Sequence, residues 1–173
     1  MIKLRKYQSK DASHIINWID NEMTFYQWSA DRYGKYPINA NDINDFYYNS
    51  HIEHAFTATD EKDRVMGHFI LRYTNKKDKT TLRIGFVIID NSLRGQGLGK
   101  RMICEAIKYS FDILKAEKLT IGVFENNAAA LRCYKSCGFD EIEDVCKYKC
   151  KGEIWNCIEM QMTSEKYKQI FKF

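Results

Sequence analysis

The stretch from residue 84 to residue 99 constrains the fold of this chain more than any other. It reads I-G-F-V-I-I-D-N-S-L-R-G-Q-G-L-G. The apolar run from Ile84 to Ile89 predicts a buried strand, and the D-N-S cluster after it predicts the turn that ends this strand. Apolar residues then recur with helical spacing from Leu98 to Leu114, so an amphipathic helix is expected to follow the glycines.

A strand, a glycine-rich turn and a helix in this order predict a phosphate-binding site. Glycines let backbone N–H groups converge on an anion at the positive end of a helix. Two common phosphate motifs do not fit. The nucleoside-triphosphate loop needs Ser or Thr after Gly-Lys, but Arg101 follows Lys100 here. The dinucleotide fingerprint needs G-x-G-x-x-G, but the turn reads G-x-G-x-G, and Lys115 stands where an acidic ribose ligand is expected.

A third pattern, R-x-x-G-x-G, is filled by Arg94, Gly97 and Gly99. Residues 126–139 read N-N-A-A-A-L-R-C-Y-K-S-C-G-F and fit a second block, N-x-x-A-x-x-x-Y-x-x-x-G-F. With both blocks in this order, one helix and one strand apart, the chain resembles the GNAT superfamily of acetyl-coenzyme A-dependent N-acetyltransferases. The resemblance covers residues 84–139, and the flanks match only in their order of elements.

The resemblance implies an α/β fold of the GNAT type: a mixed, mostly antiparallel sheet with a central splayed parallel pair of strands and flanking helices. It also implies that one strand backbone pairs with the pantetheine arm of acetyl-coenzyme A (acetyl-CoA) and that the glycine turn binds its pyrophosphate. The expected cofactor-binding residues are Val87, Ile88, Ile89, Arg94, Gly95, Gln96, Gly97, Leu98, Gly99, Lys100 and Asn127.

Acetyl transfer to an amine needs an acid that protonates the departing thiolate. Tyr134 lies seven residues after Asn127, at the position where the family has its proton donor, so it is the expected catalytic acid. Its neighbour Cys133 points about 100° away on a helix, and a thiol buried in a helix is usually inert. We therefore expect direct attack in a ternary complex without a covalent acetyl-enzyme.

The general base is less clear from the sequence. Relatives of this type carry a glutamate at the position matching Gly122, or early in the preceding strand near Arg83, and neither is a carboxylate here. Either ordered water removes the proton of the amine, or a carboxylate from elsewhere serves. Glu22 is the candidate for that second catalytic role, and we prefer water relay with Glu22 as an acceptor-side contact.

The length predicts a single domain over residues 1–173, and the resemblance implies that it is an N-acetyltransferase domain. The net charge is +4, from 27 basic and 23 acidic residues, and the charges are dispersed, so nucleic acid is not an expected partner. Six cysteines without a signal peptide or an apolar run of transmembrane length predict a cytoplasmic protein that does not bind membranes. The cysteine spacings favour no metal site, and either a monomer or a homodimer is expected.

Patterns outside the two blocks predict further elements. Strands are expected at 2–7, 54–59, 65–73, 81–89, 118–125, 141–149 and 153–162, and helices after Ser9, after Asn39 or Asn41, after Asn127 and at 163–173. Segment 20–37 contains five aromatic residues. They either line a site or pack a second helix into the core, and the sequence favours neither.

The predicted acceptor is a primary amine, either of a small molecule or of a protein N-terminus; polyamines, amino sugars and antibiotic amines all remain open. Two other functions are possible. The first is a non-catalytic, regulatory module that binds acyl-CoA, against which Tyr134 argues. The second is a nucleotide-dependent enzyme, against which the missing hydroxyl after Lys100 argues.

Overall fold

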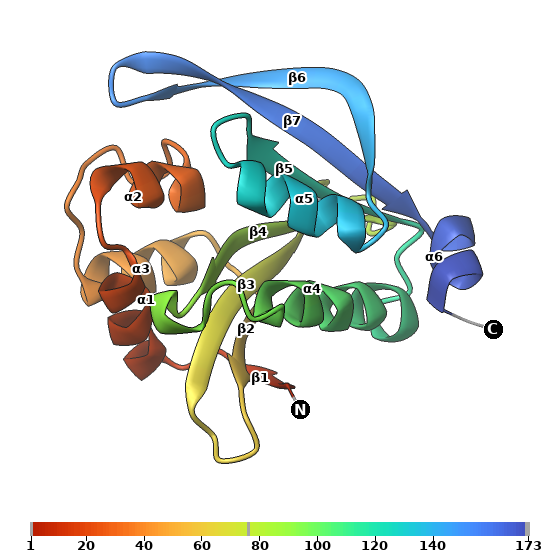
Figure 1. The fold of residues 1–173 in the computed structure, drawn as a ribbon, viewed down its shortest axis with the longest axis horizontal. Helices are drawn as coiled ribbons and strands as arrows, with labels where there is room; N and C mark the ends of the chain where they lie inside the picture. The colour runs from red at the N-terminus through yellow and green to blue at the C-terminus, as the bar shows by residue number, and fades with distance from the viewer. Residues whose placement is uncertain (1, 76, 172–173) are drawn as a thin grey trace.

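Seven strands form one sheet in the order β1-β2-β3-β4-β5-β7-β6 in the computed structural model, which describes residues 2–75 and 77–171 (Figure 1). The strands are β1 (Lys3–Lys6), β2 (His54–Thr59), β3 (Val65–Tyr73), β4 (Thr81–Ile89), β5 (Lys118–Phe124), β6 (Asp140–Cys150) and β7 (Glu153–Thr163). The α-helices are α1 (Ala12–Trp18), α2 (Glu22–Ser29), α3 (Ala40–Asn49), α4 (Leu98–Lys108), α5 (Ala128–Ser136) and α6 (Ser164–Phe171).

Strands β4 and β5 pair in parallel, and the other neighbouring strands of the described sheet pair antiparallel. The β4–β5 register runs from Thr81 opposite Lys118 only as far as Ile84 opposite Ile121. Since β4 continues to Ile89 and β5 to Phe124, the two strands part over their last residues. This confirms the predicted fold class, including its splayed parallel pair.

A β-bulge lies in the part of β4 that has separated from β5. Ile70 of β3 is opposite Gly85, and His68 is opposite Ile88, so two β4 residues face the single residue between them on β3. One of the two, Phe86, has a φ of +51°, which is rare for a bulky side chain. The bulge bends β4 beside the gap that the splayed strands leave.

Two buried apolar clusters cover the two faces of the sheet. The larger cluster includes residues of α4, α5 and α6. The second cluster joins α1, α2 and α3 to β3 and β4 through residues such as Phe25, Ile43 and Ile70. Figure 1 shows α1, α2 and α3 grouped at one end of the molecule, beside the open ends of β4 and β5.

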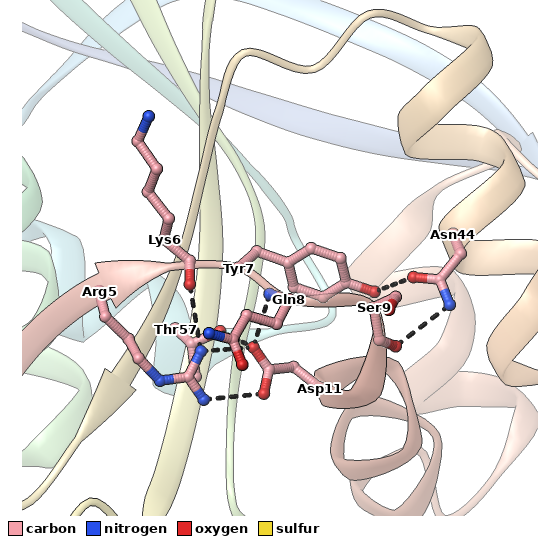
Figure 2. Close-up of polar contacts among 8 residues, drawn as sticks. All are labelled: Arg5, Lys6, Tyr7, Gln8, Ser9, Asp11, Asn44 and Thr57. Atoms are coloured by element: carbon pink, nitrogen blue, oxygen red, sulfur yellow. Dashed lines mark hydrogen bonds and ion pairs between the residues drawn. The ribbon is translucent and has the colours of Figure 1, made fainter.

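An ion pair ties the N-terminal strand to α1 and to the sheet (Figure 2). The buried carboxylate of Asp11 accepts two hydrogen bonds from Arg5, at 2.7 and 2.8 Å, and one from Thr57 of β2 at 2.8 Å. Burial acts to raise the pKa of Asp11, but hydrogen bonds from Arg5, the Gln8 backbone and Thr57 together lower it. Tyr7, the residue after β1, donates a hydrogen bond to Asn44 of α3 at 2.6 Å, so the N-terminal segment contacts both helices.

The structure corrects several element boundaries. A 3-10 turn over Ser9–Asp11 precedes α1, and Ile19 lies outside this helix. Asn39 rather than Asn41 caps α3. The helix after the glycine turn gives way to a π turn at Tyr109–Ile113. Residues 172–173 of the expected terminal helix lie outside the described residues.

Candidate active site

A cavity of about 300 Å³ occupies the gap between the splayed strands. Its walls come from β4, β5, α2, α4 and α5, which are distant from one another in the sequence. Seven of the residues expected to act in the site line it: Val87, Ile88, Ile89, Arg94, Gly99, Asn127 and Tyr134. The fold therefore brings the two sequence blocks to one site.

The other expected cofactor residues form the glycine turn at the end of this cavity and do not line it: Gly95, Gln96, Gly97, Leu98 and Lys100. Gly95 and Gly97 have φ values of +78° and +74°, and a Cβ at either position would meet no atom within 4 Å. The turn therefore needs glycine for its backbone conformation, and space is open in front of it.

Helix α4 begins at this turn, with Gly97 as its N-cap. The N–H group of Arg101 makes a hydrogen bond to the Gly97 carbonyl at 3.2 Å, so the amides of Leu98, Gly99 and Lys100 precede the first intrahelical bond. Together with the positive end of the helix dipole, these amides form an anion site that suits a pyrophosphate.

Tyr134 lies in α5, which Asn127 caps by accepting a hydrogen bond from the Ala130 amide at 3.2 Å. The tyrosine is 6% exposed and borders the cavity. Burial raises the pKa of its hydroxyl well above the ordinary value. The hydroxyl therefore stays protonated at neutral pH, as an acid that donates a proton to a leaving group must be.

Cys133 also borders the cavity, and it belongs to a cluster of three thiols. Interaction with the Cys137 thiol lowers the pKa of Cys133 and that of Cys104 on α4, and the same interactions raise the pKa of Cys137. The Cys137 thiol itself donates a hydrogen bond to the Lys100 carbonyl at 3.8 Å. No local pattern indicated this cluster, because Cys104 is remote from the other two along the chain. The expectation of an inert thiol at Cys133 did not take these neighbouring thiols into account.

Helix α2 covers the cavity on the side of the β4 bulge. Trp28 donates a hydrogen bond from Nε1 to the carbonyl of Phe86 at 3.0 Å, and its ring packs edge-on against the Phe86 ring. Phe25 of the same helix is fully buried. The aromatic segment therefore does both things that the sequence left open: it packs a helix into the core, and it borders the site.

A second cavity of about 270 Å³ adjoins the first and shares six lining residues with it: Gln27, Trp28, Ile84, Gly85, Phe86 and Gly122. Its charged lining residues are three arginines, Arg32, Arg72 and Arg83. Sequence reasoning missed this cavity. The available signal was Arg72. It lies two residues after the buried Ile70 on the same strand, so the two side chains share an inward face.

A buried ion pair explains why residue 122 is a glycine. Arg83 of β4 donates two hydrogen bonds to Glu159 of β7, at 2.5 and 2.8 Å, beneath the glycine. A Cβ on Gly122 would collide with Arg83 and would lie 2.8 Å from the sulfur of Cys157. A glutamate therefore does not fit at position 122, and the carboxylate at this level of the sheet comes from β7.

Glu22 is the first residue of α2, and its side chain is 41% exposed. Its carboxylate lies 3.3 Å from the ammonium group of Lys151, in the turn between β6 and β7. Neither cavity has Glu22 among its lining residues. Glu22 thus lies outside the walls of the cavity that Tyr134 borders.

Within residues 2–75 and 77–171, no group of three or more His, Cys, Asp or Glu residues is placed to hold a metal ion. No helix in the same part of the chain has the length and apolar character needed to cross a membrane.

Comparison with known proteins agrees with this geometry. Residues 14–139 match the Acetyltransferase (GNAT) family. The spermidine N(1)-acetyltransferase of Vibrio cholerae is 27% identical over 144 residues, which are 81% of this chain and 79% of that protein. The spermine/spermidine N(1)-acetyltransferase of Bacillus subtilis is 37% identical over 51 residues. This match covers 30% of this chain and only 34% of that protein.

A solved structure gives the same fold. The crystal structure of spermidine N-acetyltransferase from Vibrio cholerae in complex with CoA and spermine has a TM-score of 0.79 and 23% identity, and the match covers 96% of this chain and 97% of that one. The family match spans both sequence blocks, the glycine turn and most of the cavity walls. The chain therefore belongs to the GNAT family of acetyltransferases.

Proposed function

We propose that this protein is an acetyl-CoA-dependent N-acetyltransferase that acetylates a primary amine by direct attack in a ternary complex. The observation that carries the proposal is a single cavity in the gap of the sheet, which extends from Arg94 and Gly99, on either side of the glycine turn, along the open edge of β4 to Tyr134. The names of the relatives above, which act on polyamine amines, support the reaction class.

Acetyl-CoA would supply the thioester, and the open space at Gly95 and Gly97 fits its pyrophosphate. The amides of the glycine turn bind the phosphates, and the backbone of Val87, Ile88 and Ile89, unpaired with β5, holds the pantetheine arm. Arg94 and Asn127, which border the same cavity, complete the donor site.

Tyr134 acts as the acid in this mechanism. It is protonated at neutral pH because burial raises its pKa, and its hydroxyl gives a proton to the thiolate as the carbon–sulfur bond breaks. The amine attacks the thioester carbonyl as a neutral nucleophile. The one proton that its nitrogen loses as the amide forms leaves through water. Two adjoining cavities support a ternary complex, because donor and acceptor can be bound at once.

Glu22 is our candidate for an acceptor-side contact. Its pairing with Lys151 and its absence from both cavity linings support water relay over direct proton abstraction by this carboxylate. We expect Glu22→Gln to change KM for the amine while kcat stays within about twofold. A large loss of kcat at every pH with unaltered KM would instead make Glu22 the general base.

The test of the reaction is free thiol released from acetyl-CoA in the presence of a panel of primary amines, with mass spectrometry of the acetylated product. Thiol release that depends on an amine is the expected result. If acetyl-CoA raises the melting temperature but no amine causes thiol release, the protein is a non-catalytic acyl-CoA-binding module. We also propose a cytoplasmic location, since reduced thiols are usual in that compartment.

A further inference from the structure

The second cavity has an unusual charge for an enzyme whose relatives are named for polyamines. Its charged lining residues are Arg32 from the loop after α2, Arg72 from β3 and Arg83 from β4. Among the described residues, neither this cavity nor the first has an Asp or Glu side chain in its lining. All charged residues that border the space next to the thioester site are therefore cationic.

Arg72 and Arg83 lie directly opposite each other across the β3–β4 pair. Like charges in this position destabilise a sheet unless something compensates them. Glu159 compensates Arg83 through two hydrogen bonds. In the described part of the chain, Arg72 has neither an ion pair nor a side-chain hydrogen bond. A half-buried guanidinium group thus faces the cavity, and the nearby Glu159 makes its hydrogen bonds to Arg83 and not to Arg72.

Several features suit Arg72 to an anionic ligand. Burial lowers the pKa of Arg72, and the charges of Arg32 and Arg83 lower it further, against the smaller raising effects of Tyr148 and Glu159. Arginine remains protonated in proteins, so this crowding attracts an anion. The planar guanidinium fork binds carboxylate and phosphate oxygens through two parallel hydrogen bonds. Tyr148 of β6, which lines the same cavity, adds a hydroxyl donor.

On the basis of the proposed acetyl transfer, we propose that the acceptor is an amine that carries an oxyanion, a carboxylate or a phosphate, and that Arg72 with Arg32 binds this group in the second cavity. The amine then lies at the boundary of the two cavities, where Trp28, Phe86 and Gly122 belong to both. A polyamine fits this site poorly, because its remaining ammonium groups would face the three arginines.

The experiment compares matched acceptors with and without the anion. Each pair consists of an amino acid and the amine left after removal of its carboxylate, such as lysine and 1,5-diaminopentane. Phosphoethanolamine with ethanolamine tests phosphate as the source of the oxyanion, and spermidine tests the polyamine alternative. We expect kcat/KM to favour the anionic member of the preferred pair by at least about tenfold, because a charge-assisted hydrogen bond discriminates by this amount or more.

Two variants test the assignment to Arg72. In Arg72→Gln the preference for the anionic acceptor should fall by about 10- to 100-fold, through KM, while Arg72→Lys should restore part of it. The control, Arg132→Gln, removes the same charge from the exposed side of α5 and should leave the preference unchanged. The acetyl-CoA-induced rise in melting temperature shows that Arg72→Gln is folded and keeps the donor site.

Two outcomes would overturn the proposal without affecting the proposed reaction: a preference for spermidine or the decarboxylated amines, or a preference for anions that Arg72→Gln leaves intact. If no amine is acetylated, the proposed reaction fails. Calorimetric titration of the CoA-loaded protein with the amino acids and phosphoethanolamine then tests anion binding in the second cavity independently of the reaction. Binding that Arg72→Gln weakens supports the site, and absence of binding rules it out.

Discussion

At the scale of single residues, the hydroxyl of Tyr134 has the most direct link to chemistry. Tyr134→Phe removes only this hydroxyl from a buried ring, so we expect unchanged folding and acetyl-CoA binding but a turnover lower by about 10²-fold, the usual effect of a lost general acid. Steady-state kinetics with saturating substrates measures the turnover. Tyr109→Phe, which alters a partly buried tyrosine outside both cavities, is the control. Equal turnover in the two variants would make Tyr134 a packing residue.

His68 makes stability depend on pH. It is 1% exposed, lies 2.7 Å from the Tyr47 hydroxyl, and burial lowers its pKa from 6.5 to about 3. Between these two values the unfolded chain binds a proton that the folded protein does not, so stability falls as the pH drops below 6.5. We expect the free energy of unfolding in urea to be about 2 kcal/mol lower at pH 5 than at pH 7.

Two variants isolate this histidine. His68→Gln should lose most of the pH dependence between pH 7 and pH 5, with a remainder from His54, whose pKa burial also lowers, while the exposed His14→Gln should keep it. The pKa of Asp11 is lowered from 3.8, so its stabilising effect is lost only at more acidic pH and does not overlap with this window. A decline of the same size in His68→Gln would assign the effect to other groups.

At the scale of elements, the glycine turn and α4 together form the donor site. Gly97→Val should abolish the stabilisation by acetyl-CoA, which is about 2.7 kcal/mol at a hundredfold excess over Kd, because the side chain would enter the open space in front of the turn. Thermal denaturation with and without acetyl-CoA measures the effect. Gly152→Val is a matched control, since Gly152 has a φ of +79° and equally open space but lies in the β6–β7 turn.

Both valine variants place a β-branched residue at positive φ, and each should lose roughly 1–2 kcal/mol of stability for this reason. Only Gly97→Val should also lose the response to acetyl-CoA. A normal rise in the melting temperature of Gly97→Val on addition of acetyl-CoA would show that the turn does not bind the pyrophosphate.

At the scale of the whole molecule, the sheet divides where β4 and β5 part, and the Arg83–Glu159 pair links β4 to β7 beneath that division. Arg83→Met leaves Glu159 buried without its partner, so we expect a loss of about 3 kcal/mol in the free energy of unfolding. Adding Glu159→Met should recover most of the loss, because a buried pair replaced by apolar groups is often neutral.

Lys108→Met is the control for this experiment. It breaks an exposed pair with Glu105 and should change the free energy of unfolding by less than about 1 kcal/mol. If the double variant is as unstable as Arg83→Met alone, the two residues are not coupled, and the loss belongs to Arg83 itself.

The local sequence predicted the strands and helices well because their signals are short in range. Apolar runs between charged turns predicted β2, β3 and β4 with their observed bounds, and Asn127 and Gly138 marked the ends of α5. The π turn after α4 was missed because its residues continue the helical apolar pattern. The bulge at Phe86 was missed because a shift of register depends on the partner strand.

The sequence by itself determined the glycine turn and the position of Tyr134 in its block, because backbone conformation and helix capping depend on neighbouring residues. Only the tertiary structure decided what surrounds the acceptor. The Arg83–Glu159 pair joins residues 76 positions apart, and it explains both the glycine at 122 and the absence of a glutamate there. The arginine-lined cavity likewise combines residues of α2, α3 and the loops after them with residues of the five strands β3 to β7. Its charge arises from side chains that meet only when the sheet forms, so no local pattern could predict it.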